Sequence, residues 1–138
     1  MKRLVVDASV VVKLFFEEEH SDAAEKQLAR ADELLAPDLL WVEVASVVWK
    51  RHRRGDLTPE AAAGILSQAM RLPLQVYEAS ELLPDALDLA LRFDRTVYDS
   101  LYLALAVKTK TVMVSADQRL VRALADGPLK KHILWVGA

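Results

Sequence analysis

Leu4-Val5-Val6-Asp7 is the stretch of the sequence that decides the fold. Three aliphatic residues that end in a carboxylate are typical of a short strand buried on both faces of a parallel sheet. Further short apolar runs that predict strands lie at 34–36, 74–77, 111–114 and 133–136. Helical patterns separate them, at 8–16, 21–31, 39–54, 59–71, 80–93, 96–108 and 116–125. Strands that alternate with helices predict a three-layer α/β/α fold, with helices on both faces of a central, mostly parallel sheet.

Polar residues mark the boundaries of two of these helices. Asp38 precedes the helix 39–54, where a carboxylate is a favourable N-cap, and Gly55 ends it. Thr58-Pro59-Glu60 combines an N-cap, a proline in the first turn and an early acid. This combination predicts a second helix start.

The composition predicts a single domain, 1–138, because 138 residues leave room for only one. A hydrophobic fraction of 53% excludes a disordered chain and is high enough to indicate that a partner covers some surface. The net charge of −2 argues against coating nucleic acid by charge alone. Because the longest apolar run, 101–107, is too short to cross a bilayer, we expect a cytoplasmic protein.

Two carboxylates follow predicted strands. Asp7 ends the first strand, and Asp117 comes soon after the strand 111–114. In parallel α/β folds, ligands bind outside the carboxyl ends of the strands, so both acids are candidate site residues. Each also has a simpler interpretation, as a helix cap for Asp7 and as an acid that complements a helix dipole for Asp117. Either residue alone favours the simpler interpretation.

Two further carboxylates lie in otherwise apolar helices. Glu43 is the only charge between Leu39 and Trp49, and Asp99 lies in a similar apolar helix. Carboxylates are rarely buried without a partner. The simpler alternatives are a capping box between Thr96 and Asp99, and a solvated helix face for Glu43. The residues spaced along that face are Ser46, Lys50 and Arg54.

A divalent metal would compensate the charge of all four acids together. The chain has no cysteine, and its three histidines, at 20, 52 and 132, are scattered without ligand spacing. Ligation by carboxylates alone selects Mg²⁺ or Mn²⁺. Such metals take further ligands from substrate phosphates, so the four acids indicate metal-assisted hydrolysis of phosphodiesters.

In these residues the chain resembles the PIN-domain nucleases, and in particular the VapC ribonuclease toxins of prokaryotic toxin–antitoxin modules. The resemblance spans essentially the whole chain, in the expected order. The segments that carry it are Val5-Val6-Asp7-Ala8-Ser9, Glu43 in the third helix, Tyr98-Asp99-Ser100-Leu101-Tyr102-Leu103-Ala104-Leu105-Ala106 and Val114-Ser115-Ala116-Asp117. It implies a PIN-like fold for the three layers.

The resemblance also implies a mechanism and partners. By this resemblance, the acidic metal site would consist of Asp7, Glu43, Asp99 and Asp117, with Mg²⁺ or Mn²⁺ as the cofactor. Ser9 and Ser115 would orient the carboxylates or a metal-bound water. The implied reaction is RNA cleavage by metal-activated water, which leaves a 5′-phosphate and a 3′-hydroxyl without a covalent intermediate. A homodimer, inhibited by a small cognate antitoxin, would account for the apolar excess.

Other charged and aromatic residues have two interpretations each. The basic run at 50–54 either complements a helix dipole or binds RNA phosphates through Lys50 and Arg54, which share the Glu43 face. Trp41 and Trp49 are interpreted as core or dimer-interface anchors rather than base-stacking platforms. Tyr98 and Tyr102, which flank Asp99, are interpreted as packing residues with polar tips. Alternative functions are a structure-specific DNA nuclease of PIN-like fold and a catalytically silent PIN-like binding module.

Overall fold

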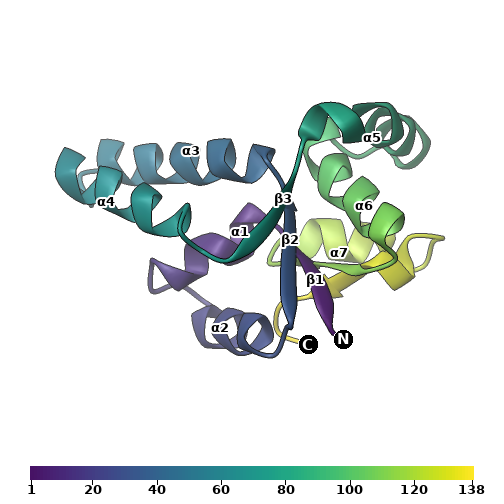
Figure 1. Cartoon of the computed structure of the whole chain (residues 1–138), viewed down its shortest axis with the longest axis horizontal. Helices are drawn as coiled ribbons and strands as arrows, with labels where there is room; N and C mark the ends of the chain where they lie inside the picture. The colour runs from purple at the N-terminus through teal and green to yellow at the C-terminus, as the bar shows by residue number, and fades with distance from the viewer.

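The computed structural model describes all residues from Met1 to Ala138 and contains one parallel sheet (Figure 1). Its strands are β1 (Arg3–Val6), β2 (Glu33–Pro37), β3 (Leu74–Tyr77), β4 (Val112–Ser115) and β5 (Ile133–Trp135). They lie in the order β3-β2-β1-β4-β5, and every neighbouring pair is parallel. The predicted three-layer α/β/α fold is therefore confirmed, with β1 at the centre of the sheet.

Helices cover both faces of the sheet (Figure 1). They are α1 (Ala8–Val11), α2 (Ser21–Ala29), α3 (Leu39–Arg53), α4 (Pro59–Ala69), α5 (Ala79–Phe93), α6 (Val97–Thr109) and α7 (Gln118–Leu124), with short 3₁₀ turns η1 (Val12–Leu14) and η2 (Lys130–His132). Leu4 and Val6 pack with residues of α1 to α4, whereas Val5 packs with α5 to α7. Alternate side chains of β1 thus enter two separate cores, as expected for a strand between two helical layers. None of the helices has the length and apolar character that a membrane span requires.

The prediction that Asp38 caps α3 is wrong. Asp38 has helical dihedral angles, and its side chain makes no hydrogen bond to the start of α3. Its Oδ1 instead accepts a hydrogen bond from the backbone N–H of Ala79 at 3.0 Å, at the start of α5. The strand pairing of β2 with β3 brings these two helix starts together, so a carboxylate that precedes one helix in sequence serves the other.

Helix boundaries were otherwise predicted to within a few residues. Thr58 caps α4 as expected, because its Oγ1 accepts a hydrogen bond from Ala61 N–H at 3.1 Å. The helix predicted over 8–16 is shorter, since α1 tightens into the 3₁₀ turn η1 and ends at Leu14. The helix predicted from residue 116 begins at Gln118, because Asp117 is its N-cap.

Candidate active site

Asp7 lies where β1 ends, beside the end of β4. These strands are neighbours, with Val6 opposite Val114, so their carboxyl ends bring the two following turns together. The Asp7 side chain is buried, with 8% of the residue exposed. Its Oδ1 accepts a hydrogen bond from Ser9 N–H at 2.5 Å, and its Oδ2 accepts one from the Ser115 hydroxyl at 2.9 Å. Asp7 therefore caps α1, as the simpler interpretation held, and also joins β1 to β4.

Two hydroxyls fix the turn after β4. Ser115 Oγ accepts a hydrogen bond from Asp117 N–H at 3.1 Å, and Ser9 Oγ accepts one from Ala116 N–H at the same distance. Asp117 is exposed and caps α7 through Oδ1, which accepts from Arg119 N–H at 3.0 Å. The structure thus places both serines in direct contact with the segments that carry Asp7 and Asp117.

Glu43 lies half-buried in the second turn of α3, and its partner comes from α6. The Tyr102 hydroxyl donates a hydrogen bond to Glu43 Oε1 at 2.6 Å, and only 2% of Tyr102 is exposed. The interpretation of Tyr102 as a packing residue with a polar tip is correct for its buried ring, but it does not identify Glu43 as the partner of the hydroxyl. One signal in the sequence could have indicated it: Tyr102 follows Asp99 by three residues, which places both on one helix face.

Asp99 lies in the first turn of α6. Thr96 Oγ1 accepts a hydrogen bond from Asp99 N–H at 3.0 Å, so one half of the predicted capping box is formed. The reciprocal bond from Thr96 N–H to the Asp99 carboxylate is not formed, and the Asp99 side chain lines a cleft instead. The capping and the site interpretations of this residue are therefore compatible.

All four predicted acids line this single cleft, which has a volume of about 320 Å³. We call it the acidic cleft. The other polar residues of its lining are Ser9, Ser46 and Lys50. Lys50 is its only cation. Arg54 does not line the cleft, because it lies at the end of α3, where its guanidinium pairs with Asp56 at 2.8 Å.

Burial makes the negative charge of the acidic cleft costly. It raises the pKa of Asp7 to about 6, an effect increased by the neighbouring charge of Glu43 and reduced by the hydrogen bonds from Ser9 and Ser115. Burial also raises the pKa of Glu43, against the hydrogen bond from Tyr102. The pKa of Asp99 is raised by burial and by the charge of Asp117. Groups in such an environment favour a proton or a cation as compensation.

The donor set of the acidic cleft fits a hard divalent cation. Hydrogen bonds engage only Oε1 of Glu43 and Oδ1 of Asp117, so each of these carboxylates keeps one oxygen free. An all-oxygen set with space for water is typical of Mg²⁺ sites. The four acids line one cleft, but no three of them lie close enough together to hold one ion between them in this structure. Repulsion between like charges favours this separation.

The fold and the acidic cleft define a class of parallel α/β proteins with clustered carboxylates at the carboxyl edge of the sheet. The model of the PIN domain family matches residues 4–125, and the chain belongs to this family.

Similar proteins include ribonucleases and a toxin–antitoxin complex. Ribonuclease VapC3 of Pyrobaculum aerophilum is 40% identical over 120 residues, which cover 86% of this chain and 92% of that protein. The crystal structure of PAE2754 from the same organism is 24% identical, has a TM-score of 0.70 and covers 98% of this chain and 90% of that one. A chain of a toxin–antitoxin complex from Klebsiella pneumoniae is 14% identical with a TM-score of 0.64, and 95% of each chain is covered. These two structures share the fold of this chain.

Proposed function

We propose that the protein is a Mg²⁺- or Mn²⁺-dependent endoribonuclease, the toxin component of a toxin–antitoxin module. The observation that carries the proposal is the meeting of four carboxylates, from four different segments, in one cleft at the carboxyl edge of the sheet. The 40% identity to a ribonuclease over most of both chains supports RNA as the substrate.

The residues that would hold the metal are Asp7, Glu43, Asp99 and Asp117. When bound, a divalent cation activates water and neutralises the charge that develops on the phosphate. The Ser115 and Tyr102 hydroxyls fix the orientation of Asp7 and Glu43, as partners of metal-ligating carboxylates generally do. The raised pKa values of Asp7 and Glu43 support a cation in this cleft, because it would stabilise both charges.

Lys50 is positioned to contact a phosphate of the RNA, since it is the only cation that lines the acidic cleft. In the reaction, the oxygen of water bonds to phosphorus, the bond from phosphorus to O3′ breaks, and O3′ takes a proton. The products are a 5′-phosphate and a 3′-hydroxyl. Binding of Arg54 to RNA stays a prediction, and that side chain would act outside the cleft.

Cleavage of labelled RNA by the purified protein tests this function. We expect activity with Mg²⁺ or Mn²⁺ that is abolished by EDTA and lowered about 1000-fold in Asp99→Asn, since one ligand of the metal is lost. The matched control is Asp22→Asn, an exposed acid of α2 outside the acidic cleft, which should retain full activity. Undiminished cleavage in EDTA or in Asp99→Asn contradicts the proposal, and cleavage of DNA alone favours the DNA nuclease.

An apolar stripe on α5 supports the homodimer. Leu83, Leu87 and Leu91 are 44%, 51% and 76% exposed, and they follow one another at four-residue intervals. Such a row lies on one helix face and suits a self-complementary interface between two copies of the chain. Leu87→Arg should therefore yield monomers in light scattering. The control Met70→Arg, at an equally exposed position on another surface, should not.

The groove between α3 and α4 is suited to an apolar segment of the antitoxin. Its lining is predominantly apolar and includes Trp49, which is 53% exposed, so this tryptophan is not a core residue. The fold is shared with a chain of a toxin–antitoxin complex, which supports a protein occupant. A small reading frame that overlaps the gene upstream should encode the inhibitor, and Trp49→Ala should weaken inhibition more than Val42→Ala, a second exposed residue of α3. An isolated gene would count against this partner.

A further inference from the structure

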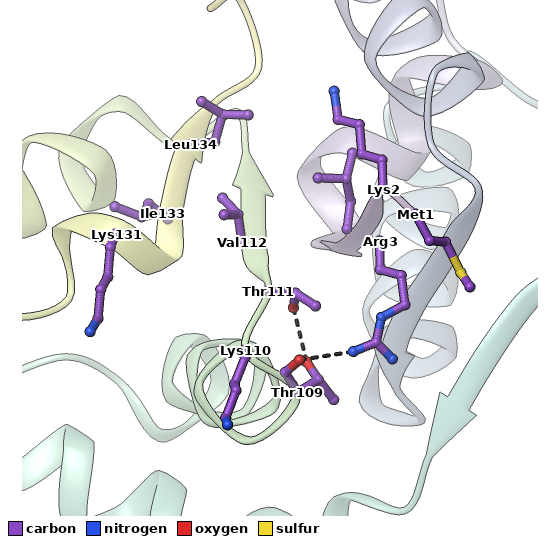
Figure 2. A pocket seen from close by; sticks show the side chains of 11 residues that line it. Met1, Lys2, Arg3, Thr109, Lys110, Thr111, Val112, Lys131, Ile133 and Leu134 are labelled. Carbon is purple, nitrogen blue, oxygen red and sulfur yellow. Dashed lines mark hydrogen bonds between the residues drawn. The ribbon is translucent and has the colours of Figure 1, made fainter.

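A second, larger depression lies at the opposite edge of the sheet, where the strands begin. Its volume is about 770 Å³, and its lining comes from the starts of β1 and β4, the turn between α6 and β4, and the η2–β5 segment (Figure 2). We call it the cationic basin. Its charged lining residues are Lys2, Arg3, Lys110 and Lys131.

The cationic basin has no carboxylate in its lining, and its four cations form none of the ion pairs of the structure. Two acids lie beside the basin: Asp32 accepts a hydrogen bond from the backbone N–H of Lys2, and Glu33 lies opposite Arg3 in the neighbouring strand. Neither forms an ion pair with a cation of the basin. In a chain with a net charge of −2, four unpaired cations around one depression are a strong local excess. Such an excess attracts an anion.

The arrangement of the side chains indicates which kind of anion. Figure 2 shows the Lys110 and Lys131 side chains extending toward the bottom of the view and the Lys2 side chain toward the top, so the three amines do not converge on one point. Arg3 donates a hydrogen bond to the backbone oxygen of Thr109 at 2.8 Å, and the hydroxyls of Thr109 and Thr111 contact each other at 2.9 Å. A compact anion would require donors that converge, whereas dispersed cations suit a chain of phosphates.

We propose that the cationic basin binds the phosphate backbone of RNA outside the acidic cleft. The proposal rests on the proposed function for the identity of the polyanion. Strands of four residues separate the two edges of the sheet by about 13 Å along the strand direction. Because helices cover both faces of the sheet, an RNA chain that occupies both sites passes around the helical layers. The basin thus captures RNA by charge while the acidic cleft, which repels phosphates unless a cation is bound, performs the chemistry.

Binding of a labelled single-stranded RNA of about 16 nucleotides, followed by anisotropy in EDTA at several salt concentrations, tests the proposal without cleavage. The double variant Lys110→Glu/Lys131→Glu should bind about tenfold more weakly. The slope of log K against log salt concentration should become shallower by about 1.4, because two phosphate contacts are lost. The control Lys26→Glu/Arg122→Glu has the same change of charge at exposed positions outside the basin and should lose no more than about twofold. Thermal melting checks that both variants are folded.

The outcomes separate this proposal from the proposed function. Equal RNA affinity in the two double variants would contradict RNA binding by the cationic basin. Displacement of RNA by inorganic phosphate at constant ionic strength would also contradict it, because that result indicates a site for a compact anion. If Lys110→Glu/Lys131→Glu is no longer inhibited by the antitoxin but keeps its RNA affinity, the basin binds an acidic protein segment and the RNA proposal is wrong. Cleavage of a short oligonucleotide that fills only the acidic cleft should be unaffected by Lys110→Glu/Lys131→Glu. Absence of cleavage in the wild type contradicts the proposed function but leaves the binding result valid.

Discussion

The two edges of the sheet carry opposite charges that are organised in opposite ways. At the carboxyl edge, Asp7 and Glu43 are buried or half-buried, and hydroxyls hold them at 2.9 and 2.6 Å. At the amino edge, Lys110 and Lys131 are exposed and unpaired. Burial and hydrogen bonding fix atoms in place, as catalysis requires, whereas exposed charge attracts without specifying a geometry. The difference indicates that one sheet can position catalytic groups at one edge and attract the substrate by charge at the other.

The largest expected effect is a dependence of stability on pH that arises at the carboxyl edge alone. Burial raises the pKa of Asp7 from 3.8 to about 6, so the folded metal-free protein binds this proton more tightly than the unfolded chain does. Stability should therefore fall as the pH rises from about 4 to about 6, by about 3 kcal/mol for this group. Urea unfolding in EDTA across this range measures the fall, and saturating Mg²⁺ should reverse it.

Two variants assign this pH dependence to one edge of the sheet. Asp7→Asn removes the acid with the largest pKa shift, so the unfolding free energy should fall less over the same range, and the remaining fall comes from Glu43 and Asp99. Lys110→Gln removes a charge at the amino edge and should retain the full dependence, because that side chain is exposed. A slope as steep in Asp7→Asn as in the wild type would contradict the assignment to Asp7, and a reduced slope in Lys110→Gln would contradict the assignment to the carboxyl edge.

The next effect tests whether the carboxyl edge depends on exact placement of Glu43. Tyr102→Phe deletes the hydroxyl that donates to Glu43 and leaves the buried ring in place. RNA cleavage and metal affinity should fall about 10- to 100-fold, the usual loss when a partner of a metal ligand is removed. Tyr98→Phe, on the same helix but 62% exposed, is the control and should change neither. Equal activity of the two variants would show that the orientation of Glu43 is unimportant.

The smallest effect compares two fully buried serine hydroxyls. Ser115 donates to Asp7, whereas Ser100 Oγ has no hydrogen-bond partner. Ser115→Ala should lower the free energy of unfolding by about 1–3 kcal/mol, since it leaves Asp7 and the Asp117 N–H less satisfied. Ser100→Ala should instead raise it by about 1 kcal/mol, because an unpaired buried hydroxyl is removed. Chemical denaturation measures both, and a loss in Ser100→Ala would mean that this hydroxyl has a partner in solution.

The sequence was sufficient to predict the layers and to select the acids that meet in the cleft. The aliphatic run at Leu4–Val6 predicts a central strand, because its alternate side chains are buried in the two cores on opposite faces of the sheet. Glu43 and Asp99 were identifiable from the sequence because a carboxylate in an otherwise apolar helix is costly to bury without a compensating partner. Lys50 and Arg54 share a helix face in the sequence, but only Lys50 lines the cleft.

The features that could not be predicted are contacts between segments distant in sequence. Tyr102 and Glu43 are 59 residues apart, and Asp38 and Ala79 are 41 residues apart. Helix capping and hydrophobic periodicity are local patterns, so they carry no information about such pairs. The cationic basin was equally hidden, because Arg3, Lys110 and Lys131 come from three separate parts of the chain. Only the strand order places them at one edge of the sheet.

The bond between Ser115 and Asp7 has a consequence for the synthesis of the protein. It joins positions 108 residues apart, and Ser9 and Ala116 form a second bond of similar span. A growing chain on the ribosome exposes Asp7 long before Asp117 has been translated, and contacts of such separation form late in folding. A partly made chain therefore carries an incomplete cleft. In a protein that cuts RNA, this delay would protect the message and the ribosome that are still producing it.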